Sequence, residues 1–156
     1  MQESKIIDGK TFIIDPMGAM SALKLKVELV GVFAPALSSL ISNGGNVSLD
    51  SEADINGAIE TLFMSLDENK FESLSKKLMV RANVCFEGNP QMQPLTNDKN
   101  FDYAFQQNLI TFYKVVWFIL QVNYKDFLGK MGNIGDLKET FINKKPIKST
   151  KSSKKS

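Results

Sequence analysis

The chain has 156 residues, of which 43% are hydrophobic and 23% charged, and its formal net charge is +2. This length is typical of one domain, and the composition is that of an ordinary globular protein. The sequence contains no histidine, which removes the commonest general base and metal ligand, and its lone cysteine excludes an internal disulfide and fits a reducing compartment. No secretory signal is recognisable at the N-terminus. We therefore expect a cytosolic protein and not an enzyme.

The charges are unevenly distributed along the chain. Residues 144–155 contain six lysines and no acidic residue, which leaves 13 basic and 17 acidic residues, a net charge of −4, in residues 1–143. We predict a single globular domain over residues 1–143 and a flexible basic tail over residues 144–156, because a Lys/Ser segment buries too little apolar surface to fold. The tail could bind nucleic acid or an acidic protein, or have no dedicated partner. The acidic domain does not favour nucleic-acid binding.

The sequence KIIDGKTFII (Lys5–Ile14) predicts a β-hairpin. Two arms rich in β-forming residues flank Asp8-Gly9, a pair that readily adopts the positive φ angles of a type I′ turn. Pro16 ends the second arm, because its nitrogen carries no hydrogen for a strand ladder.

A helix is predicted between Met17 and Ser42. Polar and small residues recur there at three- and four-residue steps and form one narrow stripe. The stripe consists of Ser21, Lys24, Glu28, Gly31, Pro35, Ser38 and Ser42. The other positions are nearly all apolar, so the helix must be covered on most of its circumference, by its own domain or by a partner. Asn43-Gly44-Gly45 is expected to end it.

Shorter elements are predicted in the middle of the chain. Helices are expected at about Asp54–Ser65 and at about residues 67–79, and Val80–Leu95 combines β-forming residues with a Gly88-Asn89-Pro90 turn. We predict one or two short strands there, which can join the hairpin in a small antiparallel sheet. The expected fold class is α+β and mainly helical, with the hairpin and small sheet packed on about four helices.

A long last helix is predicted at about Phe101–Tyr124. Its uninterrupted apolar segment, Val115–Leu120, is far shorter than the ~20 residues that a bilayer requires. Most of the circumference is apolar, as in the central helix of a bundle. A narrow polar arc of roughly 80° is expected on one side at the helical step. The arc contains Gln107, Thr111, Lys114, Gln121 and Lys125.

Phe118 also falls in this polar arc, where a monomer would normally expose a polar side chain. It is therefore either covered by the Met17–Ser42 helix or the tail, or part of a patch for a partner, since aromatic residues are enriched at interface centres. We take Phe118, Lys114, Gln121 and Thr111 as candidate partner-binding residues.

No motif in the chain predicts catalysis, a cofactor or a metal. Glu52, Asp54, Asn56 and Gly57 resemble the start of a calcium loop, but the twelfth position is Phe63, where a bidentate glutamate is required. Cys85 lies on an expected strand and is interpreted as a small core residue.

The order of these segments has a further implication. The hairpin ends in IDPMGAMSALKLKVELV; APALSSLISN and TLFMSLDENKFESLSKKLM follow, and the last helix lies in NFDYAFQQNLITFYKVVWFILQVNYKDFLG. This order resembles the tail assembly chaperones of tailed bacteriophages. The likeness covers most of residues 5–129 and is strongest at Asn100–Phe127, with an aromatic start, a Tyr-Lys-x-x-Trp core and an Asn-Tyr-Lys-Asp-Phe ending.

The resemblance implies a non-enzymatic protein in the cytoplasm of the infected bacterium that is not part of the mature virion. Such chaperones bind the tape measure protein and keep it soluble while tail-tube subunits assemble, so these two proteins are the expected partners. A longer frameshifted form is common in the family. A homo-oligomer remains open, and the alternative functions are a small structural tail or connector subunit of the virion, or a host-directed binding protein.

Overall fold

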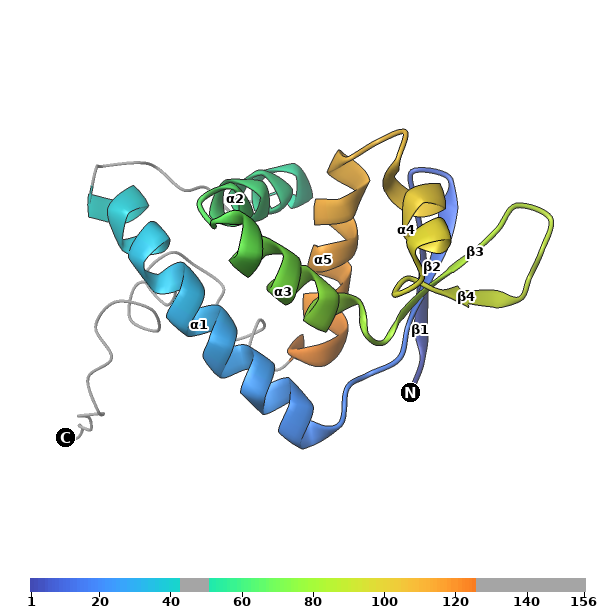
Figure 1. Ribbon diagram of the computed structural model, residues 1–156, viewed down its shortest axis with the longest axis horizontal. Coiled ribbons are helices and arrows are strands. Elements are labelled where there is room, and N and C mark those ends of the chain that lie inside the picture. The colour runs from blue at the N-terminus through green and yellow to red at the C-terminus, as the bar shows by residue number, and fades with distance from the viewer. Residues whose placement is uncertain (43–50, 126–156) are drawn as a thin grey trace.

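A computed structural model describes residues 1–42 and 51–125 of the chain (Figure 1). The described residues form five helices and a four-stranded antiparallel sheet, which confirms the predicted α+β, mainly helical fold class. The expected helix stop at residues 43–45, the domain boundary at residue 143 and the basic tail lie outside the described residues.

The N-terminal hairpin forms as predicted. Strand β1 (Glu3–Ile7) pairs antiparallel with β2 (Lys10–Ile14), and Ile7 stands opposite Lys10 across a two-residue turn. Asp8 has a φ angle of 50° and Gly9 one of 83°, the positive values that a type I′ turn requires. The turn is thus specified by the Asp-Gly pair itself.

Two further strands, where the sequence predicted one or two, complete the sheet. Strand β3 (Ala82–Cys85) pairs with β2, and β4 (Met92–Pro94) pairs with β3, so the strand order is β1-β2-β3-β4. Alternate residues of the strands point into the core, and these side chains include Ile7, Phe12, Ile14, Ala82 and Val84.

Three helices lie between β2 and β3 in the chain. They are α1 (Ala19–Ser42), α2 (Glu52–Met64) and α3 (Glu68–Met79). The Ser51 hydroxyl caps α2 by accepting a hydrogen bond from the backbone nitrogen of Asp54, so α2 begins two residues earlier than predicted. The Asp67 carboxylate caps α3 in the same way.

The prediction of one long last helix at Phe101–Tyr124 is wrong, because the chain forms two helices. These are α4 (Asp98–Phe105), capped by Asn97, and α5 (Ile110–Asn123). The Asn108 side chain accepts a hydrogen bond from the backbone nitrogen of Ile110 and so competes with a continuous helix. The break lets two aromatic rings, Phe105 of α4 and Phe112 of α5, pack edge to face at 5.6 Å.

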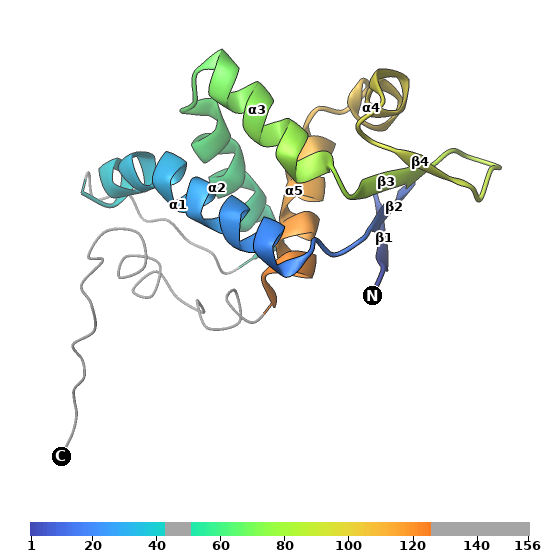
Figure 2. The same cartoon turned by 60° about the horizontal axis from the view of Figure 1, so that its bottom comes forward.

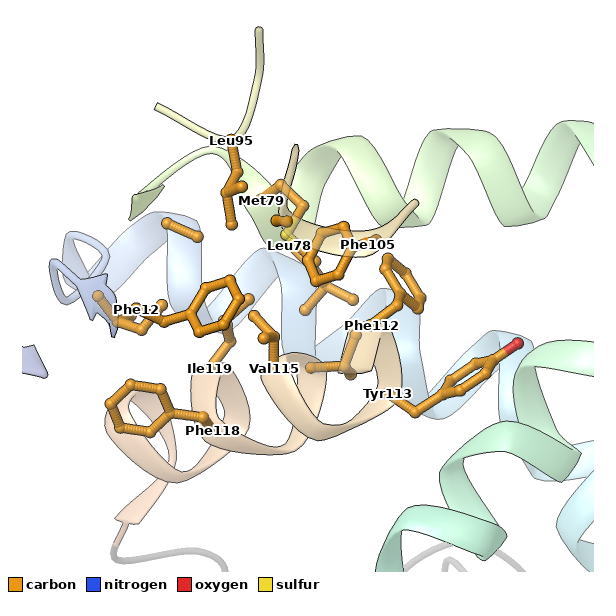
Figure 3. Packing of buried hydrophobic residues seen from close by; sticks show 14 of the residues in the cluster. Phe12, Leu78, Met79, Leu95, Phe105, Phe112, Tyr113, Val115, Phe118 and Ile119 are labelled. Carbon is orange, nitrogen blue, oxygen red and sulfur yellow. The ribbon is translucent and has the colours of Figure 1, made fainter. Parts of the chain in front are cut away.

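Helix α5 is the central element of the fold. It lies between the helices α1–α3 and the sheet (Figures 1 and 2). Figure 3 shows its buried side chains packed among residues of the sheet, α3 and α4. Phe12 of β2 is fully buried and stacks on Phe105 at 5.9 Å between ring centroids, which joins the sheet to the helical layer.

Candidate partner-binding surface

The polar arc of the last helix faces the β1–β2 hairpin. The hydroxyl of Thr111, a fully buried residue, donates a 2.6 Å hydrogen bond to the Asp8 carboxylate in the hairpin turn, and the Lys114 ammonium contacts the other carboxylate oxygen at 2.9 Å. The hydrogen bond from Thr111 and the charge and hydrogen bond of Lys114 hold the pKa of Asp8 below its usual value of 3.8. Thr111 and Lys114 therefore attach the hairpin to α5.

Phe118 also lies between α5 and the β1–β2 hairpin. It is only 5% exposed, and the Lys5 ammonium of β1 lies 5.9 Å from the centre of its ring, so the hairpin contributes to its cover. Gln121 is half-buried, and Lys125 ends the row with a 3.2 Å contact to Glu3. The sequence therefore placed these residues correctly on one side of α5. Phe118 is buried there, and its role in a partner patch stays a prediction.

The contacts of Thr111 and Lys114 with Asp8, which we call the Asp8 network, allow a test of how the hairpin is held on α5. We expect Asp8→Asn to lower the free energy of unfolding by about 1 kcal/mol at neutral pH, because it keeps a residue that tolerates positive φ but removes the charge that binds Lys114. A depressed pKa stabilises the fold fully above the unfolded-state value and loses that effect as pH falls through the folded-state value. The difference between wild type and variant should therefore shrink below about pH 4.

Urea denaturation at a series of pH values measures this difference. Glu72→Gln serves as the control, because Glu72 forms an exposed 2.8 Å ion pair with Lys76 within α3. An Asp8→Asn variant as stable as the wild type at neutral pH would mean that the network does not hold the hairpin.

The described residues contain no arrangement that indicates catalysis. They hold no group of three or more metal-ligating side chains. An open cleft of about 820 Å³ lies between the tips of the two hairpins and α4. Cys85 lines it half-buried, with its sulfur 3.5 Å from the Pro90 carbonyl, so it is less enclosed than the core residue that the sequence suggested.

Helix α1 presents an apolar surface that the described fold leaves uncovered. Met20 is 66% exposed, Leu23 57% and Val27 73%. Their spacing of three and four residues places them on one side of the helix, and we call these three residues the outer stripe. Exposed apolar residues that occur singly are normal, whereas a continuous row on one helix is typical of an interaction surface.

The opposite side of α1 is firmly attached to the domain. Leu25 and Phe33 are buried, and the Phe33 ring packs on Phe63 at 5.2 Å. The Tyr124 hydroxyl donates a 2.7 Å hydrogen bond to the Ala22 carbonyl, and burial raises the pKa of this hydroxyl to about 12, which keeps the donor protonated. The outer stripe is therefore held on a fixed support.

The wide apolar circumference of residues 17–42 already indicated this surface. The sequence left open whether the domain or a partner covers it. In the structure the domain covers the side with Leu25 and Phe33, and Met20, Leu23 and Val27 remain accessible. Which apolar residues stay exposed depends on how α1 lies on the domain, so periodicity within the helix did not single them out.

The described residues thus form an α+β domain with an exposed apolar surface on α1. The chain belongs to the phage tail assembly chaperone family: the family model described as "phage tail assembly chaperone protein, TAC" matches residues 8–135. The family is non-enzymatic, and its members act in the assembly of bacteriophage tails. This confirms the predicted family and the absence of an enzymatic function.

The other comparisons add no relative. Searches among curated proteins and among solved structures found no significant match. Among the described residues, no helix is both long and apolar enough to cross a membrane.

Proposed function

We propose that this chaperone binds the tape measure protein of its phage and keeps it soluble while tail-tube subunits assemble around it. The outer stripe of α1 is the proposed binding surface, and its exposure as a continuous row on a helix that is packed on the domain is the observation that carries the proposal. A tape measure protein is expected to present long amphipathic helices, whose apolar sides aggregate unless they are covered.

The chemistry of the outer stripe suits a reversible contact with such a helix. Methionine and leucine side chains adapt to irregular apolar partners. Burying each side chain of the stripe contributes on the order of 1–2 kcal/mol before the cost of association is subtracted, so a single contact is weak. Several copies on one long client would then hold it through avidity and be displaced one after another by tail-tube subunits.

Contact of the client with Phe118, Lys114, Gln121 and Thr111 stays a prediction. Two of these residues, Phe118 and Thr111, are buried under the β1–β2 hairpin. A client could reach them after displacement of the hairpin, which would break the Asp8 network. The outer stripe requires no such rearrangement, and the proposal therefore rests on α1.

Co-expression with the tape measure protein tests the proposal. The client should be insoluble alone and should appear in the soluble fraction, in a complex with this protein, when both are produced. An unrelated small acidic protein serves as the control. A client that stays insoluble in the presence of the chaperone would contradict the proposal.

We further propose that the protein acts in the cytoplasm of the infected host and is not incorporated into the particle. Mass spectrometry of purified virions should then detect the tape measure and tail-tube proteins but not this chain. Its presence in stoichiometric amount would instead indicate a structural tail or connector subunit.

A further inference from the structure

Strand β1 has an outer edge that no described element pairs with, since β1 is the first strand in the order β1-β2-β3-β4. The pairing of β2 with β3 determines which residues of β1 direct their backbone N–H and C=O groups toward β2 and which direct them outward. The Asp15 nitrogen donates to the Arg81 carbonyl at 2.9 Å, at the end of the β2–β3 ladder, so odd-numbered residues of β2 point toward β3. Even-numbered residues of β2 therefore bond to Glu3, Lys5 and Ile7 of β1. The backbone groups of Ser4 and Ile6 point outward.

The two edges of the sheet differ in their protection against further pairing. At the other edge, β4 has three residues and ends in Pro94, which cannot donate a hydrogen bond. Strand β1 has five residues and no proline, and Ser4 and Ile6 are exposed, Ile6 to 71%. A regular edge of this kind is a template for another strand.

We propose that two copies of this chain dimerise by antiparallel pairing of their β1 strands, with the twofold axis at Ser4. In this register Ser4 faces Ser4 of the partner subunit, and their outward N–H and C=O groups bond to each other. Glu3 then stands opposite Lys5 of the partner subunit, and this charge pair occurs twice across the axis. The two sheets join into one of eight strands.

The charges of β1 favour this register, and they favour a second copy of the chain as the partner at this edge of the sheet. Moving the axis to Lys5 would place two lysines directly opposite each other, which is unfavourable. In the chosen register both lysines meet carboxylates. Glu3 and Lys5 lie on the side of the strand that faces α5, where Glu3 contacts Lys125 and Lys5 lies over Phe118. The partner's side chains would thus extend an existing row of alternating charges.

The dimer goes beyond the proposed function and does not rest on it. The outer stripe lies on α1, a different element, so pairing through β1 leaves Met20, Leu23 and Val27 of both copies exposed. A dimer would present two stripes to one client, which raises its apparent affinity without a new contact.

Ser4→Pro tests the dimer directly. Proline removes the outward N–H at the axis in both copies but leaves the β1–β2 ladder intact, because Ser4 does not bond to β2. In sedimentation velocity of the full chain, the wild type should be a dimer. The variant should show a dimer dissociation constant raised by about tenfold or more, because two hydrogen bonds are lost together. Ile6→Lys, which places a charge on the exposed edge, should act in the same direction and provides a second variant if Ser4→Pro does not fold.

Val27→Lys is the matched control, because it also replaces an exposed apolar residue but lies on α1. It should leave the dimer intact. A wild-type chain that stays monomeric up to high micromolar concentration overturns the proposal, as does a dimer that survives both Ser4→Pro and Ile6→Lys.

Cross-linking tests the register. With Cys85→Ala as the background, Ser4→Cys should form an intersubunit disulfide under mild oxidation, because paired Cα atoms at the axis would lie about 5.5 Å apart. Ile6→Cys should not, because the two copies of Ile6 would lie four residues out of register, about 14 Å apart. Cross-linking through residue 6 in preference to residue 4 overturns the proposed pairing.

Val27→Lys also distinguishes this proposal from the proposed function. If the variant stays a dimer but no longer keeps the client soluble, client binding and dimerisation use different surfaces. A failure of one proposal then does not imply a failure of the other.

Discussion

Replacing Leu23 and Val27 together by lysine should abolish the ability of the chaperone to keep its client soluble. The change removes two of the three apolar side chains of the outer stripe and puts two hydrated ammonium groups where an apolar helix would lie. Both residues are mostly exposed, so the free energy of unfolding should change by no more than about 0.5 kcal/mol. We expect the soluble fraction of a co-expressed tape measure protein to fall to the level seen without a chaperone.

The matched control is Met64→Lys, which also replaces a 70%-exposed apolar residue by lysine but on α2. It should leave client solubility unchanged. Urea denaturation of both variants would show that any loss of binding does not come from unfolding. Full chaperone activity in the double variant would rule out the outer stripe as the client surface.

Phe12→Ala should lower the free energy of unfolding by about 3–5 kcal/mol, the range typical of a buried aromatic residue replaced by alanine. Phe12 is fully buried between the sheet and the helical layer and stacks on Phe105. The substitution leaves a cavity at the contact that joins the two layers. Because small domains are stable by about 5–15 kcal/mol, this one change would remove a large part of the total. The midpoint of urea denaturation measures it.

Phe86→Ala provides the comparison. Its ring packs on Tyr103 at 4.3 Å but is only half-buried, beside the cleft between the hairpin tips. The expected loss is smaller, about 1–2 kcal/mol, because less apolar surface returns to water and no enclosed cavity forms. Equal losses for the two substitutions would mean that Phe12 is not at the centre of the core.

The amino-acid sequence determined the elements whose causes are local. Asp8-Gly9 specifies the hairpin turn by its tolerance of positive φ, and the approximate positions of α1, α2 and α3 follow from apolar periodicity over ten or more residues. The strands at Ala82–Cys85 and Met92–Pro94 were found on either side of a turn that contains Gly88, which has a φ angle of 74°. The order of these segments was also sufficient to predict the family, and the family match over residues 8–135 confirms that prediction.

Only the tertiary structure decided which surface each helix buries. The periodicity of the last helix placed Thr111, Lys114, Phe118 and Gln121 on one stripe, but the ion pair with Asp8, more than 100 residues away in the chain, turns that stripe toward the hairpin. The exposure of the outer stripe on α1 likewise follows from packing between distant segments, whereas the break before α5 has a local cause in the Asn108 side chain. Periodicity reports which residues of a helix share a side, whereas the partner of that side is set by contacts that have no local signature.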